Sequence, residues 1–259
     1  MSEPSFEEYS EQSVHFFSRQ VPELLSEALR GMDEGATIVD VGCGDGHLVW
    51  ALSDTGHLPP GAKVIGVDLS PLRLQRFHAF TGYSGITPEG HRIPALGTGT
   101  VDLTMSTMVI EHVPDDLGHA CELGRITKAG GLLYLSTVIR KRGAWYFRKA
   151  PDGRRVLDST HVREYASVPD VVRLVEAGGF VVRRIRLSRL FFPVVHPLVR
   201  WLHARRRIPD VQRMFLRPST AWMEALALPI PRYRSIEIVA QRGEALPAAG
   251  STVHLSGLA

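Results

Sequence analysis

Short apolar runs alternate with amphipathic stretches along most of the chain. The apolar runs are rich in Val and Ile, which is typical of strands that are buried on both faces. The predicted strands are 36–42, 63–68, 83–87, 101–107, 132–138, 180–187 and 233–242. This alternation predicts an α/β fold in which a mostly parallel sheet carries helices on both faces.

Between these runs, apolar side chains recur at helical spacing. The predicted helices are 13–32, 45–53, a segment that begins at residue 70, 115–127 and 168–177. Pro22 is expected to kink the first of them. Ser70 and Pro71 have the residue types of an N-cap and a first helical position. The glycine pairs at 130–131 and 178–179 are expected to end the last two helices.

The domain organisation follows from length and local composition. A chain of 259 residues suffices for one large α/β domain. We expect a flexible arm over residues 1–12, a single domain over 13–242 and a disordered tail over 243–259. Within the domain, residues 188–232 are apolar, rich in arginine and repeatedly interrupted by proline. They are predicted to form a helical insertion before the last strand.

Composition excludes several classes of protein. Two cysteines, Cys43 and Cys121, are too few for a disulfide scaffold or a multi-cysteine zinc module. A net charge of +3 excludes a surface that is basic throughout, so we do not expect a nucleic-acid partner. The first residues lack a signal-peptide pattern, and no apolar run is long enough to span a bilayer. We therefore expect a cytoplasmic protein, whose oligomeric state the sequence does not determine.

The strongest chemical signal is a glycine-rich loop. Gly42, Gly44 and Gly46 directly follow the first predicted strand and open a helix. Glycine lets the backbone turn sharply and lets a ligand lie against it. A dinucleotide-binding loop would need a third glycine at position 47, where this chain has His47. Asp40 would repel a pyrophosphate but suits a cation, such as an α-amino group or a sulfonium.

A carboxylate completes this pattern. Asp68 ends the second predicted strand, where it can accept hydrogen bonds from both hydroxyls of a ribose. Open α/β sheets bind ligands in the crevice at the carboxyl ends of their strands. A glycine loop alone could be a plain tight turn, but the two features together favour a nucleoside that carries an amino acid.

Several segments, in the right order, resemble the motifs of class I S-adenosylmethionine-dependent methyltransferases. They are 40–46 (first motif), 64–70 (second motif), 89–94, 101–103 with 109–113 (fourth strand) and 123–135 (fifth strand). In the third of these, Glu89 stands where a family Asp holds the adenine amino group. The resemblance implies a Rossmann-like, seven-stranded sheet with an antiparallel last strand. It also implies S-adenosyl-L-methionine as cofactor and S-adenosyl-L-homocysteine as product. The implied cofactor-binding residues are Asp40, Gly42, Gly44, Gly46, Asp68, Leu69, Glu89 and Gly90.

Two histidines are candidates for catalysis. His112 follows the fourth predicted strand, and His161 lies in the long loop after the fifth. Imidazole is the side chain best suited to remove a hydroxyl proton near neutral pH. A packing or loop-fixing role remains open for both. Glu111 is expected to orient the loop, and neither cysteine is placed as a nucleophile.

The motifs that the chain has and those that it lacks limit the reactions that it could catalyse. The chain lacks the Asn/Asp-Pro-Pro-Tyr/Phe motif that holds planar amino groups, which disfavours methylation of a nucleobase amine. Asp115 and Asp116 are interpreted as the start of a helix, so we predict no metal. We expect methyl transfer to a small-molecule or lipid- or sugar-linked acceptor, with oxygen favoured. A non-methylating cyclisation or rearrangement, an RNA methyltransferase and a non-catalytic module at a membrane remain alternatives.

The insertion is the most distinctive segment. A bulky apolar stretch at 190–203 is followed by Arg205, Arg206 and Arg207. The stretch could form a lid over an apolar acceptor pocket, a dimer surface or simple packing against the sheet. Peripheral membrane contact through 190–207 is a further possibility. The basic and aromatic loop at 140–149 is expected to face the same cavity and suits a phosphate, carboxylate or sugar group.

Overall fold

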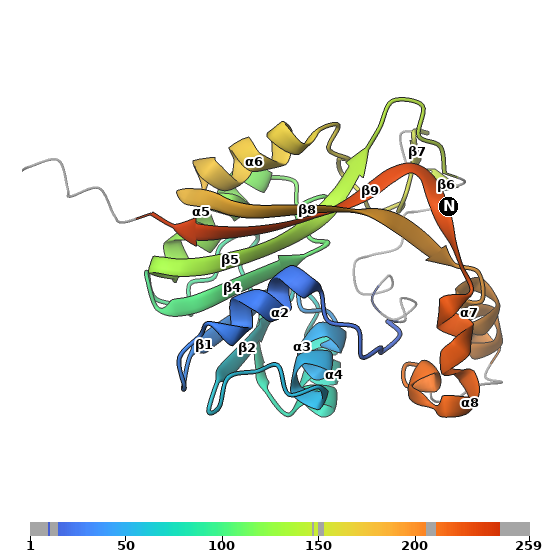
Figure 1. Cartoon of the computed structure of the whole chain (residues 1–259), viewed down its shortest axis with the longest axis horizontal. Coiled ribbons are helices and arrows are strands. Elements are labelled where there is room, and N and C mark those ends of the chain that lie inside the picture. Colours follow the sequence, from blue (N-terminus) through green and yellow to red (C-terminus); the bar gives the residue numbers. More distant parts are fainter. Residues whose placement is uncertain (1–9, 11–14, 147, 150–152, 206–210, 244–259) are drawn as a thin grey trace, which may run out of the picture.

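A computed structural model of the chain describes residues 10, 15–146, 148–149, 153–205 and 211–243 (Figure 1). The strands are β1 (Thr37–Val41), β2 (Lys63–Val67), β3 (Ser84–Ile86), β4 (Val101–Thr107), β5 (Thr127–Arg140), β6 (Arg148–Lys149), β7 (Arg155–Val156), β8 (Phe180–Pro193) and β9 (Ala227–Arg242). The helices are α2 (Glu23–Arg30), α3 (His47–Asp54), α4 (Pro71–Thr81), α5 (Asp116–Ile126), α6 (Val168–Ala177), α7 (His196–Ala204) and α8 (Pro218–Ala221), with 3-10 turns at Met214–Leu216 and Trp222–Ala225. The predicted arm and tail lie outside the described residues, except for Ser10 and Gly243.

Seven strands form one sheet in the order β3-β2-β1-β4-β5-β9-β8. β9 runs antiparallel to both of its neighbours, and the other pairings are parallel. Figure 1 shows α5 and α6 on one face of the sheet and α2, α3 and α4 on the other. The predicted Rossmann-like α/β fold with an antiparallel last strand is therefore confirmed.

The two faces of the sheet carry separate cores, because successive side chains of a strand point to opposite faces. In β1, Ile38 packs with the α2 and α3 side chains, whereas Val39 packs with those of α5 and α6. In β5, Tyr134 likewise packs in the core with α2 and α3, and Leu135 packs in the core with α5 and α6. These strands are buried on both sides, which is why they appear in the sequence as nearly continuous apolar runs.

The first predicted helix is shorter than expected. It begins at Glu23, and Pro22 stands before it with an extended backbone at φ −57° and ψ 136°. Residues 15–22 are not helical. Their apolar side chains serve tertiary packing instead, since Phe17 is fully buried and its N–H donates to the Gln212 carbonyl at 2.8 Å. The helix cannot extend upstream through Pro22, because proline has no N–H to donate to the helical hydrogen-bond ladder and its ring clashes with the preceding turn.

Two other boundaries differ from the prediction. Helix α5 ends at Ile126 rather than at Gly130, because Thr127 turns extended and pairs with Val101 as the start of β5. The strands β8 and β9 both continue into the 188–232 insertion. The two strands pair with each other there, which satisfies the hydrogen-bonding groups of their backbones. The sequence pattern did not predict this extension of the strands. The helical part of the insertion starts at α7.

No helix among the described residues has the length and apolar character needed to cross a bilayer.

Candidate active site

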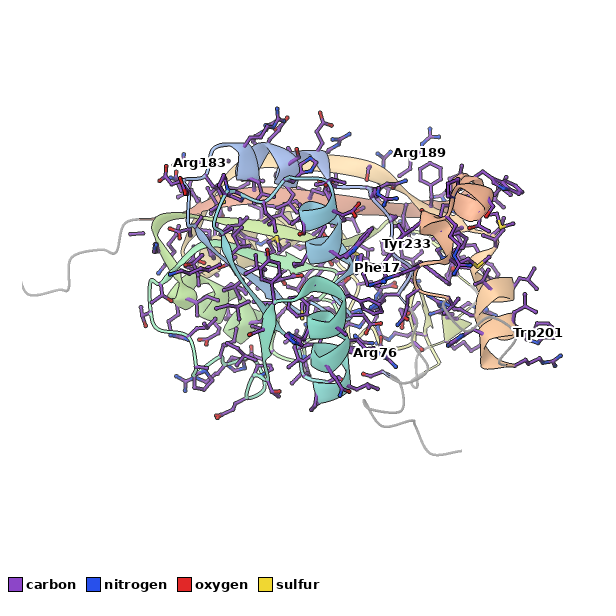
Figure 2. The ribbon with its side chains drawn as sticks, turned by 90° about the horizontal axis from the view of Figure 1, so that it is seen from below. Phe17, Arg76, Arg183, Arg189, Trp201 and Tyr233 are labelled. Atoms are coloured by element: carbon purple, nitrogen blue, oxygen red, sulfur yellow. The ribbon has the colours of Figure 1, made fainter. Side chains whose placement is uncertain are left out.

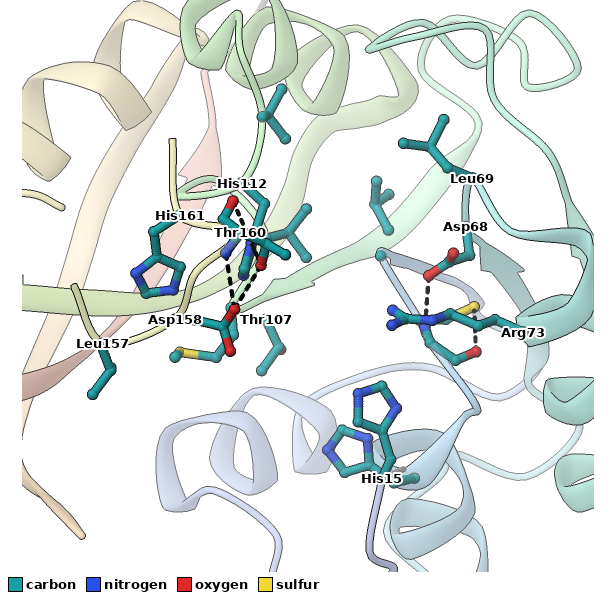
Figure 3. Close-up of a pocket in the computed structure, with 18 of the residues that line it drawn as sticks. His15, Asp68, Leu69, Arg73, Thr107, His112, Leu157, Asp158, Thr160 and His161 are labelled. Atoms are coloured by element: carbon teal, nitrogen blue, oxygen red, sulfur yellow. Dashed lines mark hydrogen bonds between the residues drawn. The ribbon is translucent and has the colours of Figure 1, made fainter. Parts of the chain in front are cut away.

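A cavity of about 1060 Å³ lies at the carboxyl ends of the central strands (Figure 3). Of the predicted site residues, seven line it: Gly42, Gly44, Asp68, Leu69, Gly90, His112 and His161. Asp40, Gly46 and Glu89 are not among its lining residues. Figure 3 shows Asp68 and Leu69 on one side of the cavity, with His112 and His161 on the other.

The glycine loop leaves bare backbone at the cavity wall. Gly42 has φ 81°, and a Cβ there would lie 2.2 Å from Cγ2 of Val109. Gly44 has φ 55°, and its Cβ would lie 2.8 Å from the His15 ring. The N–H of Gly42 donates to the Val67 carbonyl at 2.7 Å, which fixes the loop on β2. Glycine is therefore required both by conformation and by space.

Asp68 ties the loop to the second strand. Its Oδ2 accepts the Gly44 N–H at 3.0 Å, and its Oδ1 accepts the Ser70 N–H at 2.9 Å. A carboxylate oxygen can accept two hydrogen bonds, so each oxygen retains acceptor capacity toward the cavity. Ser70 also caps α4, as predicted, by accepting the Arg73 N–H on its hydroxyl.

Asp40 lies behind this loop, on β1. It is 3% exposed, and burial, together with the neighbouring Asp68 carboxylate, raises its pKa to about 7. A buried acid beside a second carboxylate creates a negative environment that a cation would stabilise. Such an environment would suit the sulfonium or amino group that the sequence interpretation expected, and that role of Asp40 stays a prediction.

The segment after β3 forms part of the opposite wall. Glu89 and Arg92 form a small backbone bridge, with N–H to carbonyl distances of 2.8 and 3.1 Å. Gly90, at the tip of this turn, lines the cavity together with His91 and Ile93. A role for the Glu89 side chain toward an adenine remains a prediction.

His112 ends a chain of hydrogen bonds. Its Nδ1 lies 3.2 Å from the Thr160 carbonyl and 2.9 Å from the Thr160 hydroxyl, which itself donates to Asp158 at 2.8 Å. Asp158 is in turn paired with Arg148 at 2.6 Å. These acceptors assign the proton of His112 to Nδ1 and leave Nε2 as its basic atom. Burial, with His161 beside it, lowers the pKa of His112 to about 4.

His161 is held by a carboxylate. Its Nδ1 lies 3.2 Å from Oε1 of Glu164, which also accepts the Leu157 N–H at 2.7 Å. The Tyr233 hydroxyl donates to Oε2 of Glu164 at 2.9 Å. Burial acts to raise the pKa of Glu164, but these donors outweigh it and hold the pKa below its ordinary value. Glu164 is therefore anionic and orients the imidazole of His161.

The sequence interpretation gave no role to three residues that position the histidines: Glu164, Thr160 and Asp158. They lie in the same loop as His161, and Glu164 follows it by three residues. That spacing was the available signal. It does not show which side chains of an irregular loop face one another, because their partners, His112 after β4 and Tyr233 on β9, come from distant parts of the chain.

One group of side chains near the histidines could hold a metal ion. Glu111, His112 and His161 each place a ligand atom within 4.8 Å of the other two. Asp115 does not belong to this group; it caps α5 by accepting the Gly118 N–H at 2.8 Å, as expected for a helix start. The neighbouring Asp116 accepts the Tyr165 hydroxyl at 2.9 Å.

The insertion contributes a wall of the cavity. Phe191 and Phe192 from the end of β8 line it together with His196 and Pro197 of α7. The 140–149 loop contributes Tyr146 and Arg148. The half of the cavity that carries the histidines is thus bounded by aromatic and apolar side chains with a few cations.

Comparisons with known proteins agree with this geometry. Residues 39–135 match the methyltransferase domain family. A tRNA U34 carboxymethyltransferase of Marinobacter nauticus is 31% identical over 53% of this chain and 46% of its own length. A ubiquinone biosynthesis O-methyltransferase of Pseudomonas paraeruginosa is 33% identical over 44% of this chain and 49% of its own length. The chain thus spans about half the length of the curated relatives it matches. A crystal structure of a methyltransferase from Bacillus halodurans superposes with a TM-score of 0.57 at 16% identity and covers 85% of this chain and 99% of that one.

Residues 39–135 therefore match the methyltransferase domain family, and the sheet has the fold of the S-adenosylmethionine-dependent methyltransferases. The residues present fit the cofactor of that family. Gly42 and Gly44 leave a cradle that a Cβ would fill, and Asp68 offers carboxylate oxygens at its edge. Asp40 is buried behind this loop with its pKa raised to about 7, so a cation bound nearby would favour its ionised form.

Proposed function

We propose that this protein transfers the methyl group of S-adenosylmethionine to a hydroxyl group of a small-molecule or lipid- or sugar-linked acceptor. The observation that carries the proposal is the pair His112 and His161, each with its Nδ1 held by an acceptor, at the cavity that the glycine loop borders. Two oriented imidazoles suit an acceptor whose proton must be removed. An amine acceptor would need no such pair in its neutral form.

The cofactor side of the site comprises Gly42, Gly44, Asp68 and Leu69, with Asp40 behind them. When bound, S-adenosylmethionine supplies a methyl group activated by the sulfonium charge. The Asp68 carboxylate offers acceptor oxygens for ribose hydroxyls, and the bare loop backbone admits the amino-acid part. These residues bind and orient, which aligns the donor with the acceptor oxygen.

The acceptor side uses the basic Nε2 atoms. The Thr160 carbonyl and the Glu164 carboxylate fix the Nδ1–H tautomers, so each ring presents Nε2 as its proton acceptor. Of the two, His161 has the stronger support as the base. Its carboxylate partner stabilises the imidazolium that would form, whereas burial keeps His112 neutral. His112 would then accept a hydrogen bond from the acceptor and hold it in place.

Calorimetric titration with S-adenosylmethionine and S-adenosylhomocysteine tests the cofactor assignment. We expect binding that Asp68→Ala weakens by about tenfold or more, since the charge-assisted hydrogen bonds from Gly44 of the loop and from Ser70 are both lost. Asp102→Asn is the matched control. Like Asp68, Asp102 is a carboxylate that accepts a backbone N–H, here from Thr37 at 2.8 Å. Thr37 lies at the start of β1, at the opposite end of that strand from the glycine loop. Failure of the wild type to bind either compound would overturn the proposal.

Formation of S-adenosylhomocysteine with a panel of acceptors tests the reaction. We expect product with hydroxylated aromatic or prenylated compounds and loss of turnover in His161→Gln. Turnover that modifies an acceptor without releasing S-adenosylhomocysteine would support the alternative of a non-methylating rearrangement. Methylation of RNA would support the third alternative, to which the tRNA-modifying relative from Marinobacter nauticus gives weight.

For the acceptor, we favour an apolar or lipid-linked molecule that is reached at a membrane surface. Exposed Leu198, Trp201, Trp222 and Leu228 gather on the insertion, and Figure 2 shows Trp201 projecting at the end of the molecule. The sequence 189–231 carries seven arginines against two acidic residues. Exposed aromatic and apolar groups beside arginines suit an anionic lipid surface. The insertion also lines the cavity, so a lipid chain could enter along it.

Flotation with phosphatidylglycerol vesicles and with phosphatidylcholine vesicles tests this contact. We expect binding to the anionic vesicles that falls with added salt and is lost in Leu198→Asp/Trp201→Ala. Val181→Asp is the control, because Val181 is exposed to a similar degree at the opposite end of β8. Equal binding of both variants, or none by the wild type, would argue against the membrane surface.

A further inference from the structure

One buried atom beside the histidines lacks an explanation in the proposed function. Glu111 is fully buried, and its Oε1 has no hydrogen-bond partner within the part of the chain that the structure describes. A buried carboxylate oxygen without a partner is destabilising, because its desolvation is not compensated by a hydrogen bond. The carboxylate belongs to the group with His112 and His161, whose ligand atoms lie within 4.8 Å of one another.

The other polar atoms of this group are already occupied. The Nδ1 of His112 bonds the Thr160 carbonyl, and the Nδ1 of His161 bonds the Glu164 carboxylate. Oε2 of Glu111 accepts the hydroxyl proton of Thr137 at 2.8 Å. Each side chain therefore has one polar atom held in place and one left over. This arrangement is typical of metal ligands, whose second polar atom is fixed by a hydrogen bond.

We propose that Glu111, His112 and His161 bind one divalent transition-metal ion, and that the acceptor hydroxyl coordinates this ion. Two imidazole nitrogens and one carboxylate oxygen suit Zn²⁺, Fe²⁺ or Co²⁺ and leave coordination positions open for substrate. Ligand bonds of about 2.0–2.2 Å at tetrahedral angles place ligand atoms about 3.4 Å apart, so a separation of 4.8 Å would have to shorten by roughly 1.4 Å. The expectation of no metal rested on Asp115 and Asp116, which lie outside this group.

The metal would change how the acceptor loses its proton. A hydroxyl on a divalent cation has a much lower pKa than in water, so its proton can leave to solvent. With the ion bound, His112 and His161 would act as ligands, and the acceptor proton would leave to solvent instead of passing to His161, which is the base of the metal-free site. Glu164, Thr160 and Thr137 would hold the ligands in orientation. The inference rests on the proposed function only for the identity of the acceptor group; binding of the ion itself is independent of it.

Cobalt titration of the full chain, first stripped of metal with EDTA, tests this site. We expect one equivalent of Co²⁺ to bind with visible ligand-field absorption, and Zn²⁺ to displace it. His161→Ala and His112→Gln should each abolish the absorption while the circular dichroism spectrum stays native. His91→Gln is the matched control, because His91 and Asp115 form another histidine–carboxylate pair at the cavity, 3.6 Å apart.

The outcomes separate this inference from the proposed function. Absence of stoichiometric Co²⁺ or Zn²⁺ binding by the wild type would overturn the metal site, as would full retention of the ion in both His161→Ala and His112→Gln. S-adenosylmethionine titration in EDTA is the independent measurement. Cofactor binding without metal binding would sink the metal site alone, whereas metal binding without cofactor binding would sink the proposed function alone.

Discussion

The rings of His112 and His161 meet edge to face, with their centroids 4.7 Å apart. The first follows β4, and the second belongs to the loop after β5. Two backbone–backbone hydrogen bonds join these segments, from the N–H groups of Val162 and Arg163 to the carbonyl of Glu111. The backbone therefore holds the two imidazoles together whether or not a ligand is present, so the acceptor side of the site is organised in advance.

Replacing Gly42 by alanine should damage the site through steric overlap as well as backbone strain. The left-handed conformation costs about 1 kcal/mol for a non-glycine residue, and the overlap with Val109 adds about 1–3 kcal/mol. Gly82→Ala is the control, because Gly82 has φ 78° and open space around its Cβ position. Urea denaturation should show the larger loss for Gly42→Ala, and Val109→Ala should restore part of it. Equal losses at the two glycines would refute the steric account.

Asp40→Asn should make the protein more stable at pH 8 and weaken its binding of S-adenosylmethionine. The pKa of Asp40 is about 7 in the folded chain, against an ordinary value of 3.8 for aspartate, so its ionisation costs stability as pH rises from about 4 to 7. One pKa unit corresponds to about 1.4 kcal/mol, and the neutral amide removes that cost. Urea denaturation at pH 5 and 8, with calorimetric titration, checks both effects. A variant less stable than the wild type at pH 8 would contradict this.

Glu164→Gln should lower kcat by roughly 10- to 100-fold and leave the affinity for S-adenosylmethionine unchanged. Glu164 is a positioning residue that acts through His161, and the amide cannot stabilise a charged imidazole. The kcat against pH profile should also shift. Glu164→Asp should recover part of the activity, since it keeps the charge. A parallel loss of cofactor affinity would show that the residue serves the fold instead.

Acid should destabilise the protein through His119. This buried residue lies 3.3 Å from the Ser106 hydroxyl, and burial lowers its pKa from 6.5 to about 4. Its contribution to stability is complete above pH 6.5 and is lost as pH falls toward 4, because the unfolded chain takes up the proton first. In His119→Gln, the difference in unfolding free energy between pH 7.5 and pH 5 should shrink. An unchanged difference would refute the assignment.

Much of the fold and the cofactor side could be predicted from the sequence. Buried parallel strands appear as apolar runs, and the loop from Gly42 to Gly46 lies within one continuous segment, so local spacing places its glycines. Asp68 ends the neighbouring strand, and parallel strands bring their carboxyl ends to one edge. Such features depend on chain order and on the backbone conformations that each residue type permits.

Only the tertiary structure determined how the side chains around His161 and Glu111 are arranged and how residues 15–22 pack. Residues 15–22 have helical periodicity yet are not helical, because burial of Phe17 outweighs a weak helical preference. His161 is held by Glu164 of an irregular loop, Glu164 by Tyr233 of β9, and Glu111 by Thr137 of β5, so these side chains meet only when the sheet is assembled. Local sequence determines periodicity and turns, but contacts between distant segments depend on packing that no single segment contains.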